Sequence, residues 1–435
     1  MSSLPAPAIS ELGIALCAVL ILLVPFAAAG LALINTGLGR SRSAAHAMLA
    51  SLSAVAVAAL VYFVCGSSWG GFAGRPAHVF MLGGKPWNWL GSSPFFLRGL
   101  PLDGSPASLA AWLQMFSVGV AALIPLGAGA DRWRLRGICA STAMFAAWTY
   151  PVFAHWVLGG GWLAQLGVNY SIGHGFVDAG GSGTLQAAGG VTALAIAWIL
   201  GPRRGKYSTA GMPSAIPGHN VILVILGCLM GLVGWLGLNA AGAILFTGSA
   251  PGSVVLIAIN TTLAAVSASL TAELITRLRF GKPDASLTAN GWVGGLAASS
   301  AACSLMKPAE AMLVGIVAGA LVTFSVEWFE FGLRVDDPGG AISVHALGGL
   351  WGVLAVGLFA RFPDQLPNQW LAQLIGIATL IGFVLPTSYG LNWLLNRLYP
   401  QRVELEGERQ GMDLHELGAD AYPEFVTHTE EYLPR

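Results

Sequence analysis

DAGGSGTLQ, from Asp178 to Gln186, and DPGGAISVH, from Asp337 to His345, are matching stretches that start 159 positions apart. Each begins with an Asp, continues through paired glycines into an apolar run, and carries one polar side chain eight residues after the Asp. Eight residues are a little over two helical turns, so that side chain faces roughly the same way as the Asp, about 12 Å further along. One interpretation is that Asp simply caps a helix. Two copies within apolar segments instead favour two structural repeats that meet at a shared pathway.

Composition indicates a protein that lies in a lipid bilayer. Of the 435 residues, 55% are hydrophobic, 10% are charged and 58 are glycines. Few soluble folds have this composition, whereas helices packed closely in lipid favour it. The formal net charge is zero, which gives no indication of a nucleic-acid partner, and we expect none.

Apolar runs near the length of about 20 residues that crosses a bilayer occur eleven times. They cover approximately 11–33, 45–67, 106–127, 137–158, 178–200, 221–246, 254–276, 286–306, 309–333, 341–361 and 370–396. The first run has no Lys or Arg before it and is long for a signal peptide, so we expect an uncleaved span. The sequence therefore predicts an all-α polytopic membrane protein with eleven transmembrane helices.

Lys and Arg residues are divided unequally between the two sets of loops. One set holds 14 of them, and the other holds only Arg75, Lys85, Arg98, Lys307 and Arg361. The positive-inside rule places the richer set and the C-terminal tail in the cytoplasm. An odd number of spans then leaves the N-terminus outside. We therefore predict a multi-pass protein of the cytoplasmic (inner) membrane.

Spans 1–5 and 6–10 each end in one of the two Asp-Gly-Gly helices. Because five is odd, the two halves have opposite topology, which makes an inverted repeat. The predicted boundaries are 1–398 for a membrane domain, with repeats at about 11–200 and 221–361 and an extra helix at about 370–396, and 399–435 for a cytoplasmic tail. The segment 67–106 is a long outer loop rich in Gly, Pro, Trp and Phe. Both a cap over the outer face and a purely structural role are open for it.

Ionisable groups at membrane depth are costly, so each is a functional candidate. His345 lies about one turn inside span 10. A neutral imidazole both donates and accepts a hydrogen bond, which suits a pore for a small polar species or a proton. The alternative is a core histidine satisfied by a neighbour. The repeat symmetry places Gln186 opposite His345 and favours pore lining, but Gln186 does not titrate near neutral pH, so a two-histidine proton relay is not available.

Asp178 and Asp337 both precede their helices. Capping is the expectation for Asp337, which follows Asp336 in a cytoplasmic loop. Asp178 lies at the outer end of span 5, where a cation would arrive, so capping and cation attraction are both open. Asn239, in GWLGLNAAG, is expected to hydrogen-bond across helices.

Other polar residues near span ends are expected to be structural. His155 and His219 belong to this group, and Glu327 and Glu330 are expected to pair with Arg334. The five cysteines lie in apolar spans without metal-like spacing. No nucleophile–base set or metal cluster is visible, so we expect no enzyme, no cofactor and no metal site.

Together these segments resemble the ammonium transporter (Amt/Mep/Rh) family over almost the whole chain. The matching stretches are GLGRSRSAAHAM (Gly37–Met48), TYPVFAHWVLGGGWLAQLG (Thr149–Gly167), GPRRGK (Gly201–Lys206), PGHN (Pro217–Asn220), GWLGLNAAG (Gly234–Gly242), DDPGGAISVHALGGLWG (Asp336–Gly352) and the tail segment GMDLHELGADAY (Gly411–Tyr422). The resemblance implies eleven helices, an inverted five-helix repeat, a pore in each subunit and a homotrimer. It also makes the tail a candidate site for a PII-like cytoplasmic regulator.

The resemblance is incomplete at the positions that matter for transport. The family usually lines its pore with two histidines; His345 matches the second, whereas the first falls on Gln186. Fungal members vary that first position, so this change is compatible with transport. Asp178 matches the family's structural Asp and is retained.

The outer mouth departs further from the family, which holds ammonium there with a Trp, a Phe and a Ser. The Trp position falls on Leu158, the Ser position on Gly242, the span 3 Phe position near Ser117 with Phe116 beside it, and a second gating Phe position on Leu238. Each lost cation–π contact forfeits about 0.5–2 kcal/mol. We therefore expect weak cation capture at the mouth.

The leading hypothesis is a divergent ammonium transporter or ammonia channel. The substrate would enter past Asp178, cross a mostly apolar pore, and pass Gln186 and His345. An apolar constriction excludes K⁺ because it does not replace the hydration shell of the ion. One alternative is an ammonium-responsive receptor that barely conducts, which the lost pore residues favour and the lack of an output domain disfavours. Another is a channel for a different small neutral molecule, which an aliphatic mouth would suit.

Overall fold

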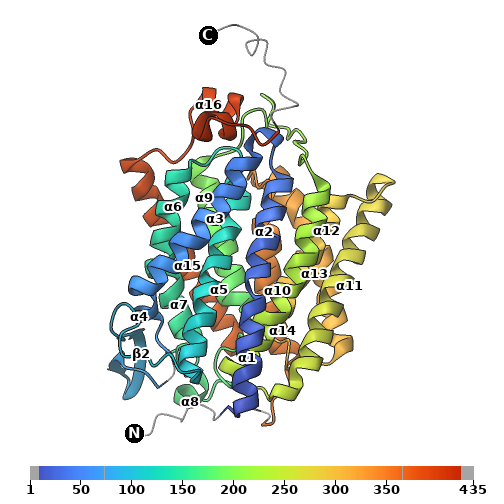
Figure 1. Cartoon of the computed structure of the whole chain (residues 1–435). Coiled ribbons are helices and arrows are strands. Elements are labelled where there is room, and N and C mark those ends of the chain that lie inside the picture. The colour runs from blue at the N-terminus through green and yellow to red at the C-terminus, as the bar shows by residue number, and fades with distance from the viewer. Residues whose placement is uncertain (1–8, 73, 365, 423–435) are drawn as a thin grey trace.

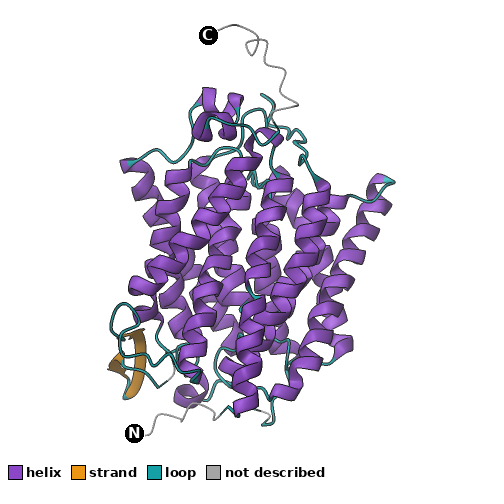
Figure 2. Ribbon diagram, in the orientation of Figure 1, coloured by secondary structure: helices purple, strands orange, loops and turns teal. Residues whose placement is uncertain are grey.

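The structure is a computed structural model that describes residues 9–72, 74–364 and 366–422, and long helices dominate it (Figures 1 and 2). Nine helices among the described residues are long and apolar enough to cross a membrane. Two further helical segments lie at the remaining predicted positions. One is the continuous helix over 135–157, and the other is the 15-residue α12 (Ala285–Ser299). Helices therefore occupy all eleven predicted span positions, and nine of them have the length and composition of a span.

The first half of the chain contains α1 to α9. The bounds are α1 Glu11–Leu23, α2 Pro25–Leu38, α3 Ala44–Val61, α4 Ser67–Gly70, α5 Pro106–Gly129, α6 Leu135–Met144, α7 Tyr150–Val157, α8 Leu166–Tyr170, the π-helix η4 Ser182–Ala187 and α9 Ala188–Leu200. Pro25 has no N–H to donate, and this interruption separates α1 from α2 within one predicted span.

The second half repeats the arrangement with one helix added. The bounds are α10 Val221–Thr247, α11 Val254–Phe280, α12, α13 Pro308–Glu327, the π-helices η6 Trp328–Gly332 and η7 Ile342–Leu347, α14 Gly348–Phe359 and the extra helix α15 Gln369–Leu398. Both halves thus end in a six-residue π-helix followed directly by an α-helix. The last residues of the two matching stretches, 182–186 and 342–345, lie in these π-helices, and the Asp and the paired glycines of each stretch precede them.

Small residues let the two halves approach closely. A Cβ atom on Gly30 of α2 would lie 2.5 Å from the carbonyl oxygen of Gly227 on α10. A Cβ atom on Gly227 would in turn lie 2.5 Å from the carbonyl oxygen of Gly30. Such reciprocal contact is possible only without side chains, as is usual for helices packed in lipid.

The predicted outer loop contains a β-hairpin, which an all-α prediction did not include. Strands β1 (Ala77–Leu82) and β2 (Lys85–Gly91) pair in antiparallel register. Trp87 of β2 stacks on Trp162 with ring centroids 4.5 Å apart, and Trp156 of α7 donates its indole N–H to the carbonyl oxygen of Trp89 at 2.7 Å. The loop therefore has its own structure, held against the end of α7.

The tail folds back onto the bundle through α16 (Leu405–Gln410) and η8 (Asp413–Leu417). Asp413 accepts hydrogen bonds from the backbone N–H groups of Ala45 and His46 at 3.1 and 2.7 Å. Glu416 accepts one from Leu135 N at 2.8 Å and lies 3.1 Å from Nε2 of His46. The tail therefore docks on the starts of α3 and α6.

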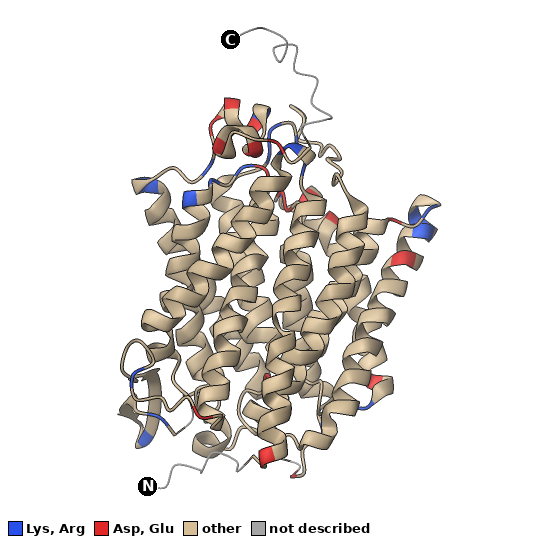
Figure 3. Cartoon of the chain, in the orientation of Figure 1, with Lys and Arg blue, Asp and Glu red and all other residues tan. Residues whose placement is uncertain are grey.

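The docked tail and the β-hairpin lie at opposite ends of the bundle (Figure 1). We call the end that carries residues 399–422 the tail end, and the end that carries β1 and β2 the hairpin end. Most charged residues lie near these two ends, while the middle of the bundle is nearly free of them (Figure 3). This distribution suits a body whose middle lies in hydrocarbon.

Candidate substrate pore

The side chains of Gln186 and His345 meet inside the bundle. Nδ1 of His345 lies 2.7 Å from Oε1 of Gln186, and the two residues are 4% and 0% exposed. Because an amide oxygen only accepts, Nδ1 is the protonated ring nitrogen with the amide in this orientation, and Nε2 is left as an acceptor. The amide Nε2 of Gln186 is buried without a partner among the described residues. The pair therefore presents both a spare donor and a spare acceptor.

Each of these two residues lies on a π-helix whose first N–H groups bind a preceding Asp. Asp178 accepts hydrogen bonds through Oδ2 from Gly183 N at 3.0 Å and from Thr184 N at 2.7 Å. Asp337 accepts from Ala341 N at 3.0 Å and from Ile342 N at 2.7 Å. Satisfying free N–H groups at a helix start is the role of a cap. Both carboxylates therefore orient the helix that carries a pore-pair residue.

Asp178 does not face open solvent, since it is only 2% exposed. Of the two roles left open for it, the structure supports capping. Asp337 is only partly buried, and desolvation raises its pKa to about 6, while the hydrogen bonds from Ile342 and Ala341 act in the opposite direction. A cation arriving at the hairpin end would thus not meet an exposed carboxylate at position 178.

Interhelical hydrogen bonds fix the start of η4. Oγ of Ser182 donates to Ala297 O and accepts from Ala301 N, both at 2.7 Å. Asn239 donates through Nδ2 to Oγ1 of Thr261 at 2.9 Å, as expected for a residue that bonds across helices. The Ser182 contacts hold the first pore helix against the end of α12, so the position of Gln186 is set by a neighbouring helix as well as by its own.

A small cavity lies at the hairpin end. The volume open to the centre of a water-sized molecule is about 10 Å³, which is close to the minimum that holds one water. Its lining includes Tyr62, Phe72, Gln114, Tyr150, Leu158 and Phe246. The hydroxyl of Tyr150 donates to Oε1 of Gln114 at 2.6 Å. The cavity therefore combines aromatic faces with polar oxygens.

Of the residues predicted at the outer mouth, the structure does not bring all to one cavity. Leu158 lines the small cavity. Leu238 is buried in the core, and a Cβ on Gly242 would lie 2.3 Å from Ala179 O, so these two are packing positions. Ser117 donates to Leu113 O in its own helix at 2.8 Å.

Phe116 packs against Trp112 with ring centroids 6.1 Å apart, and it is not among the described residues that line the cavity. Tyr62, Gln114 and Tyr150 line the cavity but were not predicted as site residues. A polar side chain within an apolar run is a signal for such residues, and Gln114 and Tyr150 both carry it.

A larger cavity of about 490 Å³ opens at the tail end. Its lining contains charged residues of both signs, among them Arg203, Lys206, Glu330, Asp336 and Asp337. It also includes Gly340 and Ser343, and Ser343 is two residues before His345 on η7. The cavity therefore leads from the tail end to the helix that carries His345.

Comparison with known proteins identifies the family. The model of the Ammonium Transporter Family matches residues 15–422. The chain belongs to this family. Among relatives, the chain is 36% identical over 430 residues to the ammonium transporter Amt2 of Archaeoglobus fulgidus. The alignment covers 95% of this chain and 88% of that protein. It is 31% identical to ammonium transporter 1 member 1 of Solanum lycopersicum, over 88% of this chain and 82% of that protein.

Solved structures of the family have the same fold. A chain described as a sensor Amt protein is 27% identical, with a TM-score of 0.83 over 93% of this chain and 97% of that one. Mep2 from Candida albicans is 24% identical, with a TM-score of 0.79 over 97% of this chain and 93% of that one. The second likeness concerns the fold alone.

In this ammonium transporter family member, a buried ion-pair network lies behind the tail-end cavity. Arg203 donates from Nε and Nη2 to the two oxygens of Asp336 at 2.9 and 3.0 Å, and from Nη1 to Asp131 at 3.0 Å. Arg132 donates from Nη2 to the carbonyl oxygen of Asp336 at 2.9 Å. Burial alone would raise the pKa of Asp336, but Arg132 and Arg203 outweigh it and hold that pKa at about 2. The network fixes the residue directly before the Asp337 cap.

The expected pairing of Glu327 and Glu330 with Arg334 is wrong. Glu327 pairs with Nη1 of Arg279 at 2.7 Å, and Glu330 pairs with Lys206. The expectation assumed a regular helix, but η6 changes the helical period there and Arg334 follows with a positive φ of 54°. The i,i+4 spacing therefore does not apply.

The two other histidines contact neighbouring segments. His155 lies 2.8 Å from Oδ1 of Asn88 in β2 and 3.0 Å from Gly70 O. His219 lies 3.1 Å from both Gly39 O and the hydroxyl of Tyr422. Both therefore connect the bundle to a loop or to the tail, which agrees with a structural role.

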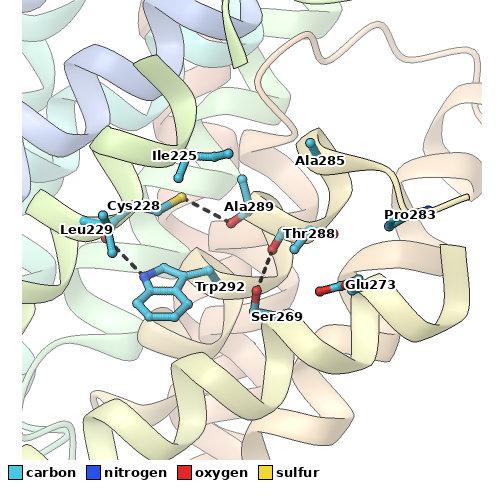
Figure 4. A pocket seen from close by; sticks show the side chains of 10 residues that line it. All are labelled: Ile225, Cys228, Leu229, Ser269, Glu273, Pro283, Ala285, Thr288, Ala289 and Trp292. Carbon is cyan, nitrogen blue, oxygen red and sulfur yellow. Dashed lines mark hydrogen bonds between the residues drawn. The ribbon is translucent and has the colours of Figure 1, made fainter. Parts of the chain in front are cut away.

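A groove of about 350 Å³ lies between α10, α11 and α12 (Figure 4). Its lining is mostly apolar, with Trp292 donating to Cys228 O at 3.1 Å and one carboxylate, Glu273. None of its lining residues belongs to η4 or η7. We therefore place the candidate pore at Gln186 and His345 and not in this groove.

Proposed function

We propose that this chain conducts ammonium or ammonia across the cytoplasmic membrane through a pore in each subunit. The observation that carries the proposal is the buried contact of 2.7 Å between Gln186 and His345, which joins the two repeat-related π-helices. Membership of the Ammonium Transporter Family and the relatives described as ammonium transporters support it. The repeats at about 11–200 and 221–361, within a membrane domain over 1–398, belong to the same proposal.

The chemistry of the pore pair suits a neutral molecule with a lone pair. The unpartnered Nε2 of Gln186 offers N–H donors to that lone pair, and Nε2 of His345 accepts an N–H in return. Ammonia has one acceptor and three donors, so it satisfies both groups, whereas K⁺ has no hydrogen to donate. Because Gln186 does not exchange a proton near neutral pH, the pair itself passes the substrate as ammonia. Any proton that crosses takes another route or stays behind.

The small cavity at the hairpin end is the proposed point of entry. Tyr62, Tyr150 and Gln114 bring oxygen atoms to it, and Phe72 and Phe246 bring aromatic faces, 6.3 Å apart. Oxygen atoms and ring faces both attract an ammonium ion. The entry is therefore less aliphatic than the substitutions at Leu158 and Gly242 alone suggest, and weak capture by these oxygens and ring faces replaces the Trp, Phe and Ser site usual in the family.

We further propose that the tail end faces the cytoplasm and that three copies form a homotrimer. The 14-to-5 division of Lys and Arg supports the orientation. The docked tail would then lie where a cytoplasmic PII-like regulator could reach it. A reporter fused after Arg435, which lies outside the described residues, tests the orientation; a signal from the outer side contradicts it.

A receptor with little conduction is the second candidate. Its specific support is the likeness to a solved chain described as a sensor Amt protein, with 27% identity and a TM-score of 0.83. Binding without flux would need the entry cavity and not an open path past Gln186. The two candidates therefore differ in transport and not in ligand.

The deciding experiment is transport by the purified full chain in liposomes. Uptake and membrane current are measured with ammonium, methylammonium and K⁺, with empty liposomes and a His345→Ala variant as controls. Transport of ammonium above both controls, without K⁺ current, supports the channel. Ammonium binding without transport above empty liposomes supports the receptor, and K⁺ current contradicts both.

A further inference from the structure

Strand β1 presents four consecutive apolar side chains that the described chain leaves about half exposed, although Phe80 packs against Trp87 and Trp89 of β2. Val79, Phe80, Met81 and Leu82 are 52%, 49%, 62% and 51% exposed. Strand β2 lies between β1 and the bundle, since its Trp87 and Asn88 contact Trp162 and His155. An exposed edge strand with four consecutive apolar side chains would promote aggregation in water. A partner with an apolar surface is therefore needed here.

The hairpin lies beside the bundle and not beyond it. Figure 1 shows β1 and β2 at the side of the molecule, level with the last turns of the helices at the hairpin end. Phe95 and Phe96, from the same loop, are also about half exposed, and Phe96 packs edge-on against Phe63 with centroids 5.8 Å apart. Phe63 is itself partly exposed, and it lies in the last third of the continuous helix Ser41–Gly70. The apolar loop surface therefore continues the side of the bundle.

Positive charge accompanies this apolar surface. Residues 67–106 contain Arg75, Lys85 and Arg98 but only one acidic residue, Asp103. The guanidinium of Arg98 lies 5.6 Å above the ring of Phe96, and Lys85 begins β2 three residues after Leu82. Three of the five Lys and Arg residues assigned to this side of the membrane are thus on one loop. Aromatic, aliphatic and cationic side chains in one element are typical of the interface between hydrocarbon and headgroups.

We propose that the hairpin is a lipid-binding element that enters the interfacial region of the leaflet at the hairpin end. Val79, Phe80, Met81 and Leu82 would lie at the hydrocarbon boundary. Lys85 and Arg98 would contact headgroup phosphates, which gives the element a preference for anionic lipid. A second copy that offers the same loop would bring like charges together, so lipid suits this surface better than self-association does.

The test measures the depth of a spin label in the bilayer. Met81→Cys and, separately, Val79→Cys are labelled in the full chain with Cys65 and Cys139 replaced by Ser, and Asp103→Cys in the same loop is the matched control. The protein is reconstituted in phosphatidylcholine liposomes with and without phosphatidylglycerol. We expect labels at 81 and 79 to collide more often with O₂ than with a water-soluble nickel chelate, and the label at 103 to show the reverse.

Each outcome decides the proposal. Greater nickel than O₂ accessibility at 79 and 81 places the strand in water and overturns it. Low accessibility to both reagents indicates cover by protein, such as a second copy, and also overturns it. The lipid preference is tested with Lys85→Gln combined with Arg98→Gln. In the parent, phosphatidylglycerol should increase the label depth at position 81, and in the double variant this increase should be lost.

Discussion

Nδ1 of His345 lies 2.7 Å from Oε1 of Gln186, although 159 positions separate the two residues in the sequence. Each residue lies on a six-residue π-helix. An Asp located eight residues before Gln186 or His345 in the sequence caps the first N–H groups of that helix. A π-helix is rare and frequently marks a functional site. The symmetry of the backbone thus extends to the contact, while the chemistry of the pair is asymmetric, with one titratable ring and one neutral amide.

Replacing His345 should remove most ammonium transport. In the His345→Ala variant the acceptor Nε2 is gone and Oε1 of Gln186 loses its partner. Loss of one partner of a buried hydrogen bond costs about 1–3 kcal/mol, and a rise of that size in the barrier to transport corresponds to a decrease of roughly 5- to 150-fold in rate. Uptake into liposomes measures it. Unchanged uptake by a correctly assembled variant would contradict the role of His345.

Gln186→His should change either the rate or the charge carried per molecule. A second imidazole provides a group that takes up and releases a proton, which the amide does not. Simultaneous measurement of current and uptake gives the charge per substrate molecule. The matched control is Gln186→Leu, which removes hydrogen bonding without adding a titratable group. If the His variant equals the wild type in both rate and charge, position 186 does not line the path.

The sequence predicted the helical positions and the pore pair because both depend on local patterns. Apolar runs define the spans, and equal Asp-to-polar spacing brings Gln186 and His345 to corresponding positions. The entry cavity depends on tertiary contacts among Tyr62, Gln114 and Tyr150, and single-sequence patterns do not show which helices meet. The hairpin was missed because β1 carries a continuous apolar run from Val79 to Leu82, and β2 alternates only over Trp87 to Trp89, which is too short for the pattern of a half-buried strand.

Weakening the tail contacts should expose the tail to protease. Asp413 and Glu416 together accept three backbone hydrogen bonds from the bundle, donated by Ala45, His46 and Leu135. The double variant Asp413→Ala, Glu416→Ala leaves those donors unpaired, so the segment after about residue 400 should open more often. Limited proteolysis followed by mass spectrometry measures the cleavage rate. Glu406→Ala, an exposed position in α16, is the control, and equal cleavage in both variants would contradict the prediction.

Asp336→Asn should destabilise the protein. Arg203 and Arg132 are buried beside this carboxylate, and its neutralisation leaves buried positive charge without full compensation. Removal of one partner of a buried pair costs about 3–5 kcal/mol. Thermal unfolding in detergent, followed by tryptophan fluorescence, should show a clear decrease in Tm. The matched control is Glu327→Gln, which removes a more exposed pair with Arg279 and should cost about 1 kcal/mol or less.

The stability contributed by Asp336 should also depend on pH in a defined direction. Arg132 and Arg203 overcome the effect of burial and hold its pKa at about 2, below the ordinary value of 3.8. Because the pKa is lower in the folded state, the charged carboxylate stabilises the protein at pH values above its unfolded-state pKa. This stability is lost as the pH falls from about 4 towards 2. The difference between the folded-state and unfolded-state pKa values corresponds to about 2 kcal/mol in the free energy of unfolding. The gap in Tm between the wild type and Asp336→Asn should therefore be constant from pH 7 to 5 and narrow below pH 4. A gap that stays constant down to the lowest pH at which both proteins remain folded would show that the charge of Asp336 does not stabilise the network.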